Sequence, residues 1–155
     1  MPAVRRLAVV LVSLVLVGAL SACGASKHTS TTGNTAGAQA QIKTAFVKFF
    51  SNKTPLEQRV ALLQNGPRFK PVIEALAKNP LASDTSASVK SVRLESGNKA
   101  SVVYTVDIGG TPLPQLKNRT GTAVKVNGRW QVGDASFCSL VAVGGTPPAV
   151  CKNAT

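Results

Sequence analysis

The stretch ASVVYTVDI, residues 100–108, decides the fold. Every second position in it is apolar, and Ser101, Thr105 and Asp107 lie between the apolar positions. Because successive side chains of a strand point to opposite faces, this alternation predicts a strand with one buried and one solvent-facing side. The sheet that contains it therefore needs a layer of other elements over one face.

The neighbouring segments predict further antiparallel strands. Residues 88–95 form a preceding strand of limited regularity, and a turn at residues 96–98 joins the two. Residues 109–118 contain two prolines and are expected to be a loop. The Asn-Gly dipeptide at 127–128 predicts a two-residue hairpin between two more strands. A last apolar stretch, residues 135–143, follows and includes Cys138.

Upstream of the sheet the pattern changes to that of helices. Two helices are predicted between residues 54 and 78, separated by Asn65-Gly66 and Pro67. A first helix precedes them, and its apolar positions follow the spacing i, i+3, i+4, i+7, i+8. Helices first and an antiparallel meander second predict an α+β fold with the helices packed on one face of the sheet. The apolar face of the first helix consists of Ile42, Ala45, Phe46, Phe49 and Phe50.

The first 22 residues have the organisation of a bacterial export signal. Arg5 and Arg6 precede an apolar run at residues 7–20 that contains no charge. A run of this length is too short to span a bilayer comfortably, so a transmembrane helix is the less favoured alternative. Residues 1–22 are therefore predicted to be a signal peptide that is removed on export.

The apolar run ends in LSAC, residues 20–23, which resembles the bacterial lipobox. The resemblance implies cleavage before Cys23 and a diacylglyceryl group, such as one carrying palmitate, on its sulfur. A single acyl chain holds a protein only marginally, whereas two or three anchor it stably. These residues predict a lipoprotein at the extracytoplasmic face of the cell membrane, with partial release as an alternative.

The segment after Cys23, GASKHTSTTGNTAGA, has the composition of a flexible linker. Residues 23–38 are therefore predicted to be a lipidated cysteine with its tether, residues 39–152 a single domain, and residues 153–155 a tail. The only histidine, His28, falls in the predicted tether and is assigned no catalytic or metal role.

Charge and composition exclude several classes of function. The chain carries 18 Lys and Arg against 6 Asp and Glu, a formal net charge of +12, but the basic residues are dispersed and aromatic residues make up only 5%. Nucleic-acid binding needs a clustered basic footprint and is not expected. Envelope proteins, lipids or anionic wall polymers are the predicted partners, although solubility alone would account for the charge. One histidine and three cysteines without metal-ligand spacing predict no metal and no cofactor.

Lipidation of Cys23 would leave Cys138 and Cys151 as an even pair in an oxidising compartment. Thirteen positions separate these two cysteines, and the glycines and prolines between them allow the chain to double back. A disulfide between them is therefore predicted. Metal ligation and a redox-active pair are less favoured, since neither a histidine partner nor a CxxC spacing accompanies them.

Four segments of the chain together resemble the mycobacterial low-molecular-weight secreted antigen family: AFVKFFSNKTPLEQRVALLQNG (45–66), NPLA (79–82), TGTAVKVNGRWQVGDASFC (120–138) and PPAVC (147–151). The resemblance covers about residues 39–151. It implies a small exported actinobacterial protein whose cone-like α+β domain is similar to the nuclear-transport-factor-two superfamily. It implies no established enzyme activity and therefore no functional residues. The lipobox is a departure from members released by an ordinary signal peptide.

The main functional prediction is a non-catalytic envelope interaction or antigen-type domain, which large exposed apolar patches would favour. The alternative is a binder of a small apolar ligand or lipid inside the cone, which an enclosed apolar cavity would favour. Its candidate ligand-binding residues, on faces that in most domains simply fill the core, are Phe46, Phe49, Phe50 and Tyr104.

The second alternative is an acid–base isomerase-like enzyme, which would need Asp107 or Glu74 in such a cavity. Tyr104 and Asp107 differ by three positions on one predicted strand and are expected to point to opposite faces. A catalytic base must reach its proton, so no catalytic residue is predicted.

Overall fold

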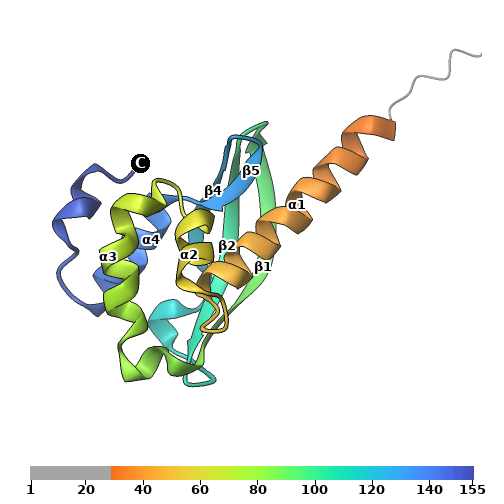
Figure 1. Ribbon diagram of the computed structural model, residues 1–155. Helices are drawn as coiled ribbons and strands as arrows, with labels where there is room; N and C mark the ends of the chain where they lie inside the picture. The colour runs from red at the N-terminus through yellow and green to blue at the C-terminus, as the bar shows by residue number, and fades with distance from the viewer. Residues whose placement is uncertain (1–28) are drawn as a thin grey trace, which may run out of the picture.

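The structure, a computed structural model, describes residues 29–155 (Figure 1). The predicted signal peptide at residues 1–22, Cys23 and His28 lie outside the described residues. Within residues 29–155, no helix combines the length and the hydropathy that crossing a membrane requires.

The first helix, α1, runs from Thr29 to Phe50 and so begins well before residue 39. This corrects the predicted tether, because residues 29–38 are helical. Alanines at 36, 38 and 40 favour a helix, and the side-chain amide of Gln39 donates to the Val92 carbonyl at 3.0 Å. Since adding a residue to an existing helix costs far less than starting one, the packed part of α1 extends into the glycine- and threonine-rich segment.

Two shorter helices follow in the predicted region, α2 (Leu56–Leu62) and α3 (Gly66–Ala77). Asn65 between them adopts a left-handed backbone with φ of 54°, which reverses the chain direction. A 3₁₀ turn, η1 (Pro80–Asp84), then leads into the sheet.

The sheet is antiparallel and strongly curled, with the strand order β1-β2-β4-β5 and β3 paired to β2. The predicted Asn127-Gly128 hairpin joins β4 and β5, and both of its residues have positive φ, 49° and 79°, as this turn type requires. The segment predicted to be a loop contains β3 and the 3₁₀ turn η2 (Pro114–Leu116). The five strands are β1 (Thr85–Ser96), β2 (Lys99–Ile108), β3 (Thr111–Pro112), β4 (Arg119–Val126) and β5 (Arg129–Val132).

Burial alternates along β2 as the sequence predicts, and the buried side faces the helices. Helices α1 and α2 lie against the curled sheet and α3 packs beside α2 (Figure 1), and one continuous apolar core joins the helices to the sheet. The predicted α+β class, with helices packed on a curved antiparallel sheet, is confirmed. The largest fully buried side chains include Ile42, Phe46, Leu63, Phe69 and Tyr104.

The aperiodic apolar stretch near the C-terminus is a helix, α4 (Asp134–Val141), followed by η3 (Ala142–Gly144) and η4 (Ala149–Asn153). The predicted tail at residues 153–155 belongs to the domain, because the Thr155 amide donates to Oδ1 of Asp134 at 2.9 Å. The domain therefore continues to the last residue instead of ending at residue 152.

Candidate functional site

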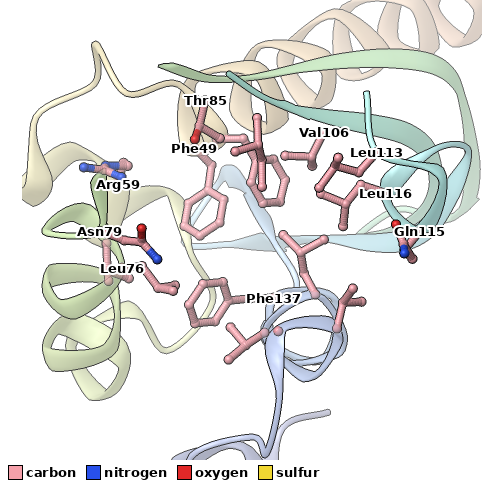
Figure 2. A pocket seen from close by; sticks show the side chains of 17 residues that line it. Phe49, Arg59, Leu76, Asn79, Thr85, Val106, Leu113, Gln115, Leu116 and Phe137 are labelled. Carbon is pink, nitrogen blue, oxygen red and sulfur yellow. The ribbon is translucent and has the colours of Figure 1, made fainter. Parts of the chain in front are cut away.

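An apolar cavity of about 420 Å³ lies between α3, α4 and the adjoining ends of β1 and β2 (Figure 2). This volume falls within the range of roughly 300–1,000 Å³ that is usual for small-molecule sites. Aliphatic side chains from α3, β2, η2 and α4 form most of its wall, among them Ile73, Val106, Leu116 and Leu140.

The four residues predicted to bind a ligand divide into two pairs. Phe49 and Phe50 line the cavity, whereas Phe46 and Tyr104 lie beneath it in the core. Phe50 stacks on Tyr104 with ring centroids 5.4 Å apart, so the two pairs are in direct contact. Phe49 meets Phe137 of α4 edge to face at 5.6 Å, which ties α1 to the opposite wall of the cavity.

The rim of the cavity is apolar and exposed. Leu76 of α3, Leu113 before η2 and Val143 of η3 all line the cavity, yet their exposed fractions are 40%, 41% and 42%. These three residues belong to segments far apart in sequence, and all three lie along the same cavity. Both the interior of the cavity and the surface around its mouth are therefore suited to contact with an apolar molecule.

One end of the cavity is polar, because Arg59 of α2 and Asn79 lie there, opposite Gln115 (Figure 2). Arg59 is the charged residue among the described residues that line the cavity. Its Nε is enclosed and has no hydrogen-bond partner in the part of the chain that the structure describes. Burial lowers the pKa of the Arg59 guanidinium, because desolvation disfavours the charged form.

The acid–base pair considered from the sequence is not brought together. Tyr104 is fully buried, and this burial raises the pKa of its phenol, a shift that the nearby charge of Arg119 only partly offsets. Asp107 falls on the other face of β2, as predicted, because the burial pattern alternates through this part of the strand. Among the described residues, the cavity wall contains no carboxylate, and Glu74 of α3 lies outside it.

Asp134 and a disulfide hold the α4 wall in place. Asp134 is fully buried, and its Oδ2 accepts a hydrogen bond from Asn65 Nδ2 at 2.7 Å. The predicted disulfide between Cys138 and Cys151 is present and links α4 to η4. Both features are structural, since neither Asp134 nor either cysteine lines the cavity. The described residues contain no cluster of His, Cys, Asp and Glu suited to a metal ion.

Several cavity residues were not predicted from the sequence. Leu113 and Leu116 fall in the predicted loop, and Leu140 and Val143 belong to a stretch without a usable period. Arg59 lies on a predicted helix, but no local pattern sets it apart from the other dispersed basic residues. The two leucines of the predicted loop, Leu113 and Leu116, were the available signal, because a solvated loop has little need of them.

Fold and cavity together define a small α+β domain with an apolar pocket of ligand size. A family model described as "Low molecular weight antigen MTB12, C-terminal domain" matches residues 35–148, about three quarters of the chain, and the chain belongs to this family. The resemblance to the low-molecular-weight antigen family is thereby confirmed. No curated protein and no solved structure matches the chain. The similarity to the nuclear-transport-factor-two superfamily therefore stays a prediction.

Proposed function

We propose that the protein is an exported lipoprotein whose domain binds a small apolar ligand or lipid at the extracytoplasmic face of the membrane. The observation that carries this proposal is the cavity of about 420 Å³ with its mostly apolar wall. A site of this kind gains affinity by removing apolar ligand surface from water, at roughly 25 cal/mol per Å².

The distribution of exposed apolar side chains supports ligand binding over docking to a flat partner surface. Three of the five large apolar side chains that are exposed in the described residues, Leu76, Leu113 and Val143, surround the cavity. The apolar surface is therefore gathered at the mouth of a pocket, where a ligand would enter. A non-catalytic role fits this wall, because neither Asp107 nor Glu74 reaches the cavity.

Filling the cavity should abolish binding. Val141 lines it from α4, and Val141→Trp places an indole in the space that a ligand would occupy. A neutral long-chain alcohol carrying a photoreactive diazirine should label the peptide that contains residue 141 in the wild type, and this variant should lose at least about nine tenths of the labelling. Peptide mapping by mass spectrometry after illumination measures the effect.

The matched control is Val126→Trp, the same substitution at an exposed position on β4 that does not line the cavity. It should label like the wild type. Equal labelling of both variants, or labelling spread evenly over the surface of the wild type, would contradict binding inside the cavity.

Anchoring is proposed on the lipobox at residues 20–23. Because thioether formation needs the cysteine sulfur, Cys23→Ala should remain unacylated and keep its signal peptide. Labelling of growing cells with an alkyne-bearing palmitate should mark the wild type and leave the variant unmarked. Wild-type protein without label would contradict the lipid anchor, and a labelled variant would show that the acyl group is attached at another residue.

A further inference from the structure

Resting on the proposed function, we infer that the ligand is a single-chain amphiphile with one negative charge, such as a fatty acid, whose carboxylate is bound by Arg59. The inference depends on the contrast between the two ends of the cavity. The Arg59 guanidinium stands at one end (Figure 2), whereas the other polar lining residues, Thr85, Asn79 and Gln115, are uncharged and the rest of the wall is apolar.

Arg59 is not neutralised by the described part of the protein. Glu57, its neighbour on α2, forms an ion pair with Lys70 of α3 instead. The enclosed Nε of Arg59 lacks a hydrogen-bond partner among the described residues. A donor on a partly buried cation is costly to leave unpaired, so an incoming oxygen acceptor would remove a penalty as well as add a contact.

The chemistry of the guanidinium selects the head group. Its planar set of N–H donors matches a carboxylate, which can accept two parallel hydrogen bonds. One guanidinium balances one negative charge, and the described cavity wall offers no second cation for a doubly charged phosphate. A monoanionic carboxylate is therefore favoured over a phosphate monoester.

The geometry also places the chain of the ligand. From Arg59 the cavity extends toward Leu113 and Leu116, which lie on its far side (Figure 2). A hydrocarbon tail attached to a carboxylate at Arg59 would lie along Phe49 and between these leucines. An uncharged hydrocarbon could fill the same space, but it would leave Arg59 unpaired.

The test compares matched probes on the full-length protein purified in a nonionic detergent. A diazirine-bearing fatty acid, the alcohol of the same chain and the corresponding alkyl phosphate are titrated at neutral pH, and the half-saturating concentration for labelling of the residue-141 peptide is measured. In the wild type the acid should half-saturate at a concentration roughly tenfold lower than the alcohol, the effect of one charge-assisted contact. The alkyl phosphate should bind no more tightly than the acid.

The variant Arg59→Gln keeps an amide donor but removes the charge. It should raise the half-saturating concentration of the acid about tenfold and leave that of the alcohol unchanged, which also shows that the cavity has folded. The control Arg129→Gln makes the same charge change at an exposed residue outside the cavity and should change neither value.

The outcomes separate this inference from the proposed function. If no probe labels the cavity of the wild type, the proposed function fails. If the acid and the alcohol label it equally, or if Arg59→Gln leaves their ratio unchanged, ligand binding stands and the role of Arg59 is overturned. Tighter binding of the phosphate would overturn the single-charge assignment. If Arg59→Gln no longer binds the alcohol either, the variant has lost the cavity and the wild type alone is the test. A wild type that binds the acid about tenfold more tightly than the alcohol then supports the inference, and equal binding of the two probes overturns it.

Discussion

Phe46→Ala should lower the free energy of unfolding by about 3–5 kcal/mol, the usual cost of removing a buried aromatic ring. Phe46 has an exposed fraction of 0% and contacts Tyr104 edge to face with ring centroids 5.1 Å apart. The ring lies between α1 and the hollow face of the sheet, where two rigid layers limit collapse around the space it leaves. Chemical denaturation followed by circular dichroism measures the loss.

Val47→Ala is the control for this substitution, since it lies on the same helix with an exposed fraction of 42% and should change stability by no more than about 0.5 kcal/mol. Because Phe46 does not line the cavity, the folded Phe46→Ala protein should still take up the neutral photoprobe. A loss of only about 1 kcal/mol would show that the core refills the space, and selective loss of labelling would assign Phe46 to the ligand site.

Removing the Cys138–Cys151 disulfide should cost about 3 kcal/mol, the chain-entropy value for a closed loop of this length. Cys138 is buried in α4 and Cys151 packs against the core from η4. Without the bond, few apolar contacts hold the chain after Val143. Urea unfolding of the wild type with and without a reductant measures the contribution of the crosslink directly.

Comparison of the double variant Cys138→Ala/Cys151→Ala with the reduced wild type separates the effect of the crosslink from that of losing the two sulfur atoms. Its stability should not respond to reductant, and it should be close to that of the reduced wild type. Identical unfolding midpoints for the wild type with and without reductant, with both thiols alkylated in the reduced sample, would show that the bond contributes nothing to stability.

The elements of the fold that neighbouring residues specify, such as an alternating strand or a two-residue hairpin, could be predicted from the sequence. The alternation at residues 100–108 and the hairpin at Asn127-Gly128 each depend on neighbouring residues, and both are confirmed. The α4 helix gave no such signal, because Ser136, Phe137 and Cys138 are consecutive and all buried. A helix enclosed on most sides has no single apolar stripe, so periodicity does not distinguish it from a strand.

The cavity could be predicted only in part, for a related reason. Phe49 and Phe50 were found because they share the apolar face of one helix. Arg59 and Leu113 reach the same space from segments far apart in sequence, and no local pattern records that they meet. Residues that pack the core and residues that line a cavity are of the same apolar types. The sequence alone therefore does not distinguish Phe46, which packs in the core, from Phe49, which lines the cavity.

The length of α1 changes the mechanics of attachment. A helix of 22 residues is about 33 Å long, and in Figure 1 its N-terminal part projects past the sheet. Five residues lie between Cys23 and Thr29, a distance of at most about 20 Å. In a protein anchored through Cys23, as proposed, a stiff helix and not a long linker would then join the domain to the membrane. The helix would then hold the cavity away from the lipid headgroups and limit the orientations in which the cavity mouth could meet them.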